Sequence, residues 1–181
     1  MRYGSPYKII EFDARALQKI NRAINSNEMG WEKGVVPEAK GRILRKSEVT
    51  WINDERVDNI LLEACDYCNN GNWGLDIQGI EPVQFGIYPE GGFYNWHVDQ
   101  HNARLNQVRK ISMSLFLNED YEGGDFDLEL YKPGTDPRFE SFKLPKGSAI
   151  FFQADQWHRV RPVTSGVRKS IVAWFYGPPY S

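Results

Sequence analysis

Residues 110–118 read Lys-Ile-Ser-Met-Ser-Leu-Phe-Leu-Asn, and apolar residues occupy every second position of this stretch. The alternating residues are Ile111, Met113, Leu115 and Leu117. Successive side chains of a β-strand point to opposite faces, so a period of two indicates a strand with one buried face. The stretch therefore predicts a strand, and it lies within a longer region of similar texture.

That region begins at about Leu75, where short runs of β-branched and aromatic residues are separated by Gly, Pro, Asn and Asp. Such runs predict short strands joined by turns. The expected strands are Leu75–Ile80, Val83–Tyr88, Tyr94–Val98, Lys110–Asn118, Asp125–Leu130, Ser141–Leu144, Ala149–Phe152, His158–Val163 and Lys169–Tyr176. A series of this kind is typical of a β-sandwich or barrel.

The first third of the chain has a mixed pattern. We expect Asp13 to cap a helix whose apolar residues recur at helical spacing; they are Leu17, Ile20, Ala23 and Ile24. A second helix is expected to start near Asn53 or Asp54 and to continue to Asn69, with irregular or extended structure over Gly30–Trp51. The sequence thus predicts helices before a β-rich core.

Length and composition favour one globular domain. The chain has 181 residues, of which 41% are hydrophobic, and it contains no evident repeat or linker. We expect residues 1–74 to be a helical and extended support for a core of residues 75–181. A net charge of −2 gives no support to nucleic-acid binding. We see neither the ~20 apolar residues of a membrane span nor a signal-peptide pattern, so a cytoplasmic location is expected.

Cys65 and Cys68 form a C-x-x-C spacing, which is found in redox sites and in halves of zinc sites. The chain has no second cysteine pair to complete a zinc site. On the expected helix both cysteines fall on the apolar face. This favours the interpretation that they are two small thiols of the core.

His97 and Asp99 are two residues apart at the end of the expected strand Tyr94–Val98, and if the strand geometry continues to Asp99 their side chains point to the same face. His158, on a distant expected strand, supplies a third ligand. Two histidines and one carboxylate form the facial triad of non-haem iron(II) oxygenases, which leaves coordination positions open for a 2-oxo acid and dioxygen. Two alternatives remain open here: His101 as a competing ligand, and a plain surface hydrogen bond between His97 and Asp99.

Arg168 and Ser170 are two residues apart at the start of the last expected strand, Lys169–Tyr176, so in strand geometry they share one face. Arginine offers a planar donor fork that fits a carboxylate, so the pair is a candidate clamp for the far end of a dicarboxylic acid. The alternative is a solvated basic stretch over Arg161–Lys169. The apolar run Ile171–Trp174 that follows favours a buried clamp.

Several motifs follow one another in a fixed order between Gln84 and Tyr176: Gln84-Phe85-Gly86-Ile87-Tyr88, Gly91-Gly92-Phe93-Tyr94-Asn95-Trp96-His97-Val98-Asp99, Ser114-Leu115-Phe116-Leu117-Asn118, Tyr121-Glu122-Gly123-Gly124-Asp125-Phe126, Gly147-Ser148-Ala149-Ile150-Phe151-Phe152, His158-Arg159-Val160-Arg161-Pro162-Val163 and Gly166-Val167-Arg168-Lys169-Ser170, followed by Trp174. No single motif is specific, but their combination resembles the iron(II)- and 2-oxoglutarate-dependent dioxygenase superfamily. The most similar branch is the prolyl 4-hydroxylase-like one.

The resemblance implies a mainly β chain with flanking helices, built on a double-stranded β-helix or jelly roll. It implies iron(II), 2-oxoglutarate and dioxygen, with ascorbate as a further ligand and with succinate and carbon dioxide as products. The residues that match the family's sites are His97, Asp99 and His158 for the metal and for catalysis; Arg168, Ser170 and Tyr88 for 2-oxoglutarate; and Tyr94, Trp96, Phe116 and Trp174 for the substrate pocket. Animal collagen-type members have Lys in place of Arg168, so the chain departs from them there.

The substrate implied by the resemblance is a prolyl residue in a peptide or protein. A hydroxylase of a free amino acid or other small molecule is the alternative, followed by a nucleic-acid demethylase, a zinc hydrolase and a jelly-roll binding module without activity. We expect specificity to depend on Gln100–Val108, Tyr131–Phe139 and the first third of the chain. In that third, residues 45–52 resemble a strand before the core in microbial and phage members. Oligomeric state is left open.

Overall fold

The computed structural model describes residues 4–28, 30–37, 43–100, 102–104, 106–130 and 138–180, with the side chains of all of these except 35–37 and 102–104. The secondary-structure elements within these ranges follow in the order β1 (Tyr7–Glu11), α1 (Ala14–Asn25), β2 (Glu32–Pro37), β3 (Ile43–Ile52), α2 (Glu55–Asn70), β4 (Gly79–Ile80), β5 (Val83–Tyr88), β6 (Phe93–His97), β7 (Asn102–Arg104), β8 (Gln107–Phe116), β9 (Tyr121–Gly123), β10 (Phe126–Glu129), β11 (Phe139–Phe142), β12 (Ser148–Gln153), β13 (His158–Val160), β14 (Val163–Gly166) and β15 (Arg168–Gly177). The prediction of a mainly β chain with helices near its start is confirmed.

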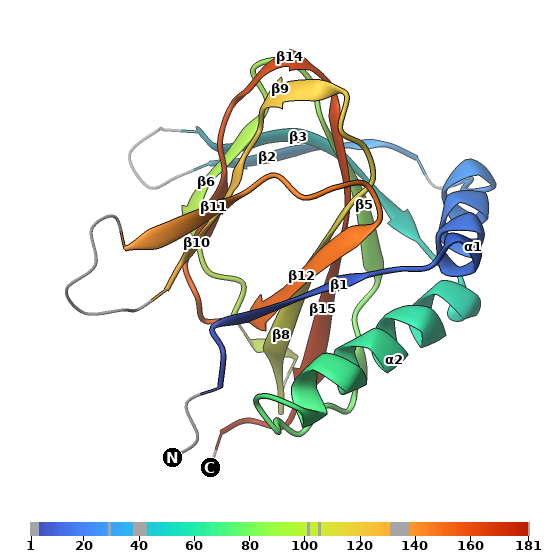
Figure 1. Ribbon diagram of the computed structural model, residues 1–181, viewed down its shortest axis with the longest axis vertical. Helices are drawn as coiled ribbons and strands as arrows, with labels where there is room; N and C mark the ends of the chain where they lie inside the picture. Colours follow the sequence, from blue (N-terminus) through green and yellow to red (C-terminus); the bar gives the residue numbers. More distant parts are fainter. Residues whose placement is uncertain are drawn as a thin grey trace.

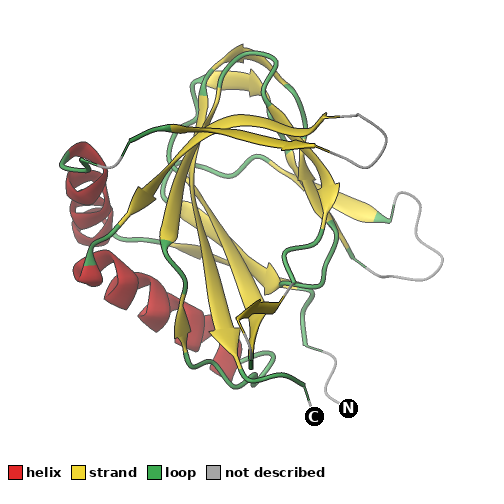
Figure 2. Ribbon diagram, turned by 180° about the vertical axis from the view of Figure 1, so that it is seen from behind, coloured by secondary structure: helices red, strands yellow, loops and turns green. Residues whose placement is uncertain are grey.

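One large antiparallel sheet forms the body of the molecule. Its main path runs β1-β12-β8-β15-β5-β3-β6-β13-β10-β11, while β2, β4 and β7 pair at its sides and β9 pairs with β14 separately. The sheet curls round an interior, and both helices lie on one outer side of it (Figures 1 and 2). The curl brings β6 and β13 to the wall that faces β8 and β15 across the interior.

The side chains of β8 alternate between its two faces, and each face contributes to a different hydrophobic core. Ile111, Met113 and Leu115 join a core with the helices on the outer face, where Leu61 and Cys65 of α2 are fully buried. Phe116 belongs instead to the inner core. The inner core also contains Tyr88, Tyr121, Phe126, Leu128, Phe142, Ile150, Phe152, Val160 and Val163. The inner core therefore fills much of the curled sheet around the site described below.

Both helices begin at the residues that the sequence predicted. The Asp13 side chain accepts a hydrogen bond from the backbone N–H of Ala16 at 2.7 Å, and the Asp54 side chain accepts one from that of Arg56 at 2.9 Å. Each carboxylate thus satisfies a donor that a helix start leaves free. Since α2 packs its buried face on the sheet, these caps also fix where the helical layer sits.

Two of the expected strands differ from the structure. Of Leu75–Ile80, only Gly79–Ile80 is a strand; the N–H and the C=O of Leu75 bond the side chain of Asn69, so Leu75 is attached to the end of α2 and not to a neighbouring strand. The expected strand His158–Val163 is two strands, β13 and β14, which pair with different partners. Pro162 lies at the break, where it has no N–H to donate to a ladder.

The first third of the chain supplies more strand than the sequence indicated. β1 pairs with β12, and β3 pairs with both β5 and β6. Residues 45–52, for which a strand was expected, lie within β3. The division of the chain at residues 74 and 75 stays a prediction. No helix in the described ranges is long and apolar enough to cross a membrane.

Candidate metal and cosubstrate site

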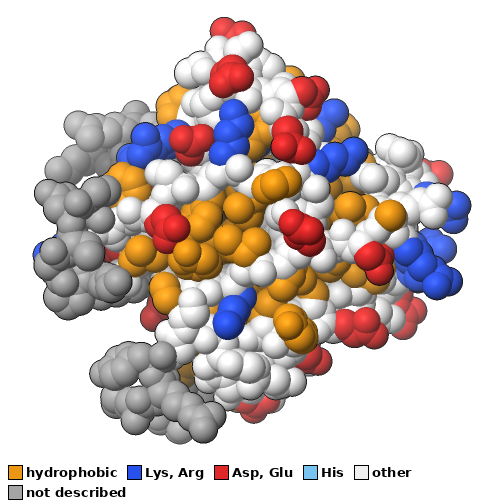
Figure 3. Space-filling model, viewed as in Figure 1, with side chains coloured by type: hydrophobic (Ala, Val, Ile, Leu, Met, Phe, Trp, Pro, Cys, Tyr) orange, Lys and Arg blue, Asp and Glu red, His pale blue; other side chains and the backbone are white. Residues whose placement is uncertain are grey.

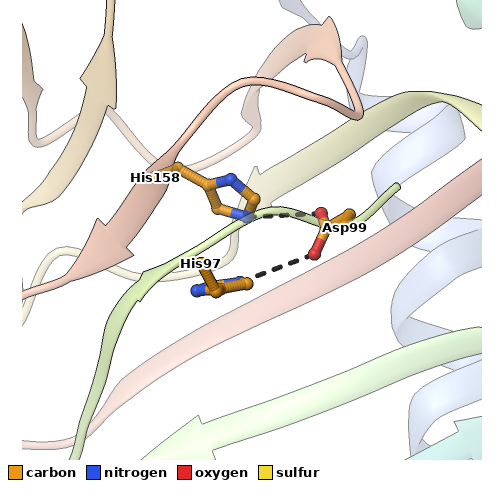
Figure 4. Close-up of side chains that lie close together, drawn as sticks. All are labelled: His97, Asp99 and His158. Atoms are coloured by element: carbon orange, nitrogen blue, oxygen red, sulfur yellow. Dashed lines mark ion pairs between the residues drawn. The ribbon is translucent and has the colours of Figure 1, made fainter. Parts of the chain in front are cut away.

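Two histidines face each other across neighbouring strands at one end of the interior. His97 is the last residue of β6 and His158 is the first of β13, and the two are direct partners in the antiparallel register. Their ring centroids lie 4.1 Å apart. The register therefore brings together two residues that are far apart in the sequence, as Figure 4 shows.

Asp99 completes the cluster from just beyond the end of β6. Its backbone N–H donates to the carbonyl of Ala154 at 3.0 Å, so the chain stays attached to the sheet after the strand ends. One carboxylate oxygen lies 3.5 Å from Nε2 of His97, and the other lies 3.2 Å from Nε2 of His158. All three side chains therefore offer ligand atoms within 4.8 Å of one another.

Backbone carbonyls orient both imidazole rings. Nδ1 of His97 lies 2.7 Å from the carbonyl oxygen of Asn95, and Nδ1 of His158 lies 2.9 Å from that of Gln156. A carbonyl oxygen only accepts, so each Nδ1 carries a proton and each Nε2 points to the cluster, where a neutral ring would offer its lone pair to a metal. This is the arrangement in which a metal-binding histidine is held by an outer hydrogen bond.

The charges of the cluster are strongly coupled. Burial alone would raise the pKa of Asp99, but the attraction and hydrogen bonds of His158 and His97 outweigh it and hold that pKa well below its usual value. Burial and the repulsion of His158 lower the pKa of His97. The pKa of His158 is raised, because Asp99 outweighs its burial. At neutral pH the carboxylate is therefore ionised, as a metal ligand must be.

A buried guanidinium lies in the same pocket as the cluster. Arg168 begins β15 and is 1% exposed, and it lines the pocket with all three residues of the cluster. Its Nη1 donates to Oγ of Ser170 at 3.2 Å, whereas its Nε and Nη2 are buried and have no hydrogen-bond partner among the residues that the structure describes. Buried donors of a charged group are costly to leave unpaired, so this site fits an anion.

The residues present fit iron(II) and a dicarboxylate. Two neutral imidazoles and one carboxylate are the ligand types of a facial triad. The unpaired donors of Arg168 and the hydroxyl of Ser170 suit a carboxylate. Tyr88 is the direct partner of Arg168 on β5 and lines the same pocket, with its ring centroid 5.4 Å from the guanidinium carbon.

Of the four residues expected in the substrate pocket, two line it and two do not. Tyr94 stacks on His97 with ring centroids 3.5 Å apart, and both Tyr94 and Trp174 line the pocket. Phe116 is fully buried next to Arg168, 5.0 Å from the ring centroid to the guanidinium carbon, and is not a lining residue. Trp96 lines a separate surface pocket with Phe139, since adjacent strand residues point to opposite faces.

The site also involves Ser112 and Arg45, which were not predicted. Ser112 is not a lining residue but donates from β8 to the second carboxylate oxygen of Asp99 at 2.8 Å, whereas Arg45 lines the pocket from β3. A signal for the serine exists in the sequence, because Ser112 and Ser114 interrupt an apolar strand on the face opposite to Ile111 and Met113. His101, the alternative ligand, lies outside the described residues.

Charged side chains are interspersed on the face drawn in Figure 3, around hydrophobic side chains in its middle. A polyanion would be attracted by an extended area of positive charge. This face therefore gives no support to a nucleic-acid interface, in keeping with the net charge of −2.

Comparisons with known proteins agree with this geometry. Residues 83–176 match the family model described as the 2OG-Fe(II) oxygenase superfamily. A PKHD-type hydroxylase of Picosynechococcus sp. is 41% identical over 98 residues, which are 52% of this chain and 42% of that protein. Another from Synechococcus sp. is 33% identical over 131 residues, 68% of this chain and 55% of that protein. The chain thus spans about half of the length of these curated relatives.

Solved structures show the same fold. The structure of a Pseudomonas putida prolyl 4-hydroxylase has a TM-score of 0.69 at 20% identity, covering 97% of this chain and 94% of that one. A viral collagen prolyl hydroxylase from Paramecium bursaria Chlorella virus-1, solved with 2OG, has a TM-score of 0.67 at 23% identity, covering 98% and 99%. The expected jelly-roll core is confirmed.

Proposed function

Because the chain belongs to the 2OG-Fe(II) oxygenase superfamily, we propose that it is a 2-oxoglutarate-dependent dioxygenase that hydroxylates a C–H bond. One observation carries the proposal: the cluster of His97, Asp99 and His158 shares a pocket with the unpaired guanidinium of Arg168. A metal site alone fits many proteins. A metal site that shares its pocket with a buried carboxylate clamp fits a cosubstrate bound next to the metal.

His97, Asp99 and His158 would hold iron(II) in this site. When bound, iron(II) supplies the redox chemistry that divides dioxygen between the two organic molecules: one oxygen atom enters the substrate as hydroxyl, and the other enters succinate as carbon dioxide leaves 2-oxoglutarate. Asp99 contributes the single negative charge of the ligand set. Asn95 and Gln156 keep the two imidazole rings oriented through their carbonyls.

Arg168, Ser170 and Tyr88 would bind the far carboxylate of 2-oxoglutarate. Arg168 supplies the N–H groups of its two unpaired buried nitrogens, Nε and Nη2, and Ser170 supplies a hydroxyl beside them. The inner-core rings of Phe126 and Phe152, which line the pocket, limit the access of water. A dry wall strengthens the charge pairing at Arg168 and protects the reaction from side reactions with water.

The substrate we propose is a prolyl residue in a peptide or protein. Three observations support it: curated relatives are named PKHD-type hydroxylases, structures with this fold are named prolyl hydroxylases, and one of these was solved in complex with a peptide fragment. The particular peptide in that structure is a ligand of that hydroxylase, and it supports only the class of substrate proposed here. For assays we also propose ascorbate as an added reductant, with a parallel arm that omits it.

The decisive test removes the metal ligands one at a time. We expect His97→Ala and Asp99→Ala to abolish succinate release that depends on a prolyl peptide, while circular dichroism stays unchanged. Glu63→Ala, on an exposed face of α2, is the control and should retain activity. Hydroxylation by the Asp99→Ala protein would show that the assigned triad is not the catalytic metal site.

A substrate panel separates the alternatives of the same enzyme class. Prolyl peptide, free amino acid and oligonucleotide are incubated separately with iron(II) and 2-oxoglutarate, and succinate is measured. Peptide-dependent succinate supports the proposal. If succinate formed only with the oligonucleotide, the substrate would be a nucleic acid and the proposed prolyl substrate would be wrong.

A further inference from the structure

Arg45 is a second buried guanidinium in the pocket, and neither the metal cluster nor the cosubstrate clamp needs it. It lies on β3 opposite Tyr94 of β6 and is 8% exposed. It lines the same pocket as Arg168 and Asp99. Arginine keeps its charge at all ordinary pH values, so Arg45 places a permanent positive charge there.

Arg45 is held in a fixed orientation by its neighbours. Its Nε donates to Oγ of Ser47 and its Nη2 donates to Oε1 of Gln84, both at 2.8 Å. Its guanidinium carbon lies 4.8 Å from the ring centroid of Tyr94. Gly34 leaves room for this arrangement, since a Cβ there would lie 2.5 Å from Oγ of Ser47 and 3.1 Å from Nε of Arg45.

The charge of Arg45 has no acidic partner among the described side chains. The carboxylate of Asp99 is already shared by two histidines, and Glu81 pairs with Arg109 at 2.6 Å. Two of the five N–H groups of Arg45 bond Ser47 and Gln84. No acceptor for the others is found in the described part of the chain, and none of them is among its fully buried unpaired donors, so they are accessible to a ligand in the pocket that Arg45 lines.

Arg45 lies close to the metal cluster, in contact with Tyr94, a residue expected to line the substrate pocket. The ring of Tyr94 stacks on the imidazole of His97 and is also in contact with the guanidinium of Arg45. Arg45 is thus one aromatic ring away from a metal ligand. On the proposed function, iron(II) and the 2-oxoglutarate dianion balance each other, and Arg168 balances Asp99. The charge of Arg45 is then left for a further anion.

We propose that Arg45, oriented by Ser47 and Gln84, binds a carboxylate of the molecule that is oxidised. This inference rests on the proposed function and narrows its substrate to molecules that bear a carboxylate near the oxidised carbon. The planar fork of an arginine fits a carboxylate through two parallel hydrogen bonds. The carboxylate belongs to a free amino acid, to the C-terminus of a peptide, or to an acidic residue beside the prolyl residue.

Three matched pairs of probes distinguish these sources. L-proline is compared with L-prolinamide, N-acetyl-Ala-Pro with its C-terminal amide, and N-acetyl-Glu-Pro-Gly-amide with its Gln counterpart. Each pair differs by one negative charge at one position. Dissociation constants are measured by calorimetry on the full chain loaded with Mn²⁺ and saturating 2-oxoglutarate, so that binding is read without turnover. We expect the acid of one pair to bind at least about 30-fold more tightly than its neutral counterpart.

Variants assign that difference to Arg45. Arg45→Gln removes the charge and should abolish the preference for the acid, and Arg45→Lys should restore part of it because Lys keeps the charge without the fork. In both variants the dissociation constant of 2-oxoglutarate should stay within about threefold of wild type. This change is small compared with the roughly 30-fold difference in dissociation constant expected between the acid and neutral probes. Arg168→Gln is the matched control: it should weaken 2-oxoglutarate and leave the acid preference of the probe, measured at saturating 2-oxoglutarate, in place. Unfolding curves confirm that all three variants fold.

The proposal is overturned if no acid probe binds better than its neutral counterpart, if Arg45→Gln keeps the preference, or if Arg45→Gln weakens 2-oxoglutarate instead. Failure of the proposed function looks different, because wild-type protein would then neither bind 2-oxoglutarate in the presence of metal nor release succinate with any substrate. An intact 2-oxoglutarate site without acid preference overturns the role of Arg45 alone.

Discussion

Ser112 holds the carboxylate of Asp99 from a strand that supplies no metal ligand. Its Oγ donates to the same oxygen that lies 3.2 Å from Nε2 of His158. Asp99 follows the end of β6, so its side chain depends on this bond and on the contact of its backbone with Ala154. A ligand beyond the end of a strand needs such outer bonds to keep its orientation.

We predict that Ser112→Ala lowers metal affinity by about 10- to 100-fold, the usual cost of losing an outer-shell hydrogen bond. Affinity for Mn²⁺ is measured by equilibrium dialysis. Ser148→Ala is the control, because Ser148 is 2% exposed, against 1% for Ser112, and begins β12, a strand that supplies no residue of the cluster. Equal affinities for the two variants would show that Asp99 does not need Ser112.

The sequence predicts single residues well where strand parity applies, and poorly where the contact crosses the sheet. The spacing of His97 and Asp99 was enough to place their side chains together, although Asp99 lies just outside the strand. The same rule shows why Trp96, between them in the chain, lies elsewhere. Arg45 was not predicted, because its role depends on β3 lying between β5 and β6, a pairing that local spacing does not specify.

At the scale of elements, the sequence predicts those whose pattern is local. Val83–Tyr88 has the expected bounds, and both helices start at their expected caps. β1 was not predicted, because its five residues gain their order from β12, a partner far along the chain. β2 lies within Gly30–Trp51, for which irregular or extended structure was expected without a definite strand.

Helix α2 presents its two thiols to the sheet rather than to solvent, as its apolar face predicted. Cys65 and Cys68 are free and 0% and 2% exposed. Burial raises the pKa of both, and that of Cys68 rises from 9.0 to about 11. The fold therefore favours the protonated thiols, and the thiolate is the form that reacts with alkylating reagents.

We predict that neither thiol reacts readily in the native protein at pH 8. A rise in pKa of two units lowers the thiolate fraction of Cys68 about 100-fold, and both thiols should react when urea unfolds the chain. The free energy of unfolding should also fall as pH rises from 9 towards 11, because the unfolded thiols ionise first. Cys68→Ala should reduce that pH dependence. Rapid alkylation of the folded wild type would contradict the burial of these residues.

At the scale of the whole molecule, the site depends on pairings between distant segments. The metal cluster joins the end of β6 to the start of β13, and the candidate clamp lies at the start of β15. Family resemblance predicts this convergence, whereas propensities and spacing within one chain predict only that several strands exist. The order of strands is a property of loop closure and mutual packing, which local patterns do not encode.

Because these segments belong to one sheet, ligand binding should stabilise the molecule as a unit. Anything that binds only the folded state raises the free energy of unfolding, by about 2.7 kcal/mol at a concentration 100 times its dissociation constant. We predict this rise in urea unfolding with Mn²⁺, a further rise when 2-oxoglutarate is added, and loss of both on chelation. Asp99→Ala should lose the metal effect, since its removal leaves two ligands on β6 and β13. If Asp99→Ala retained the full stabilisation, the metal would be bound elsewhere. The pairing of β6 with β13 would then not serve to form a metal site.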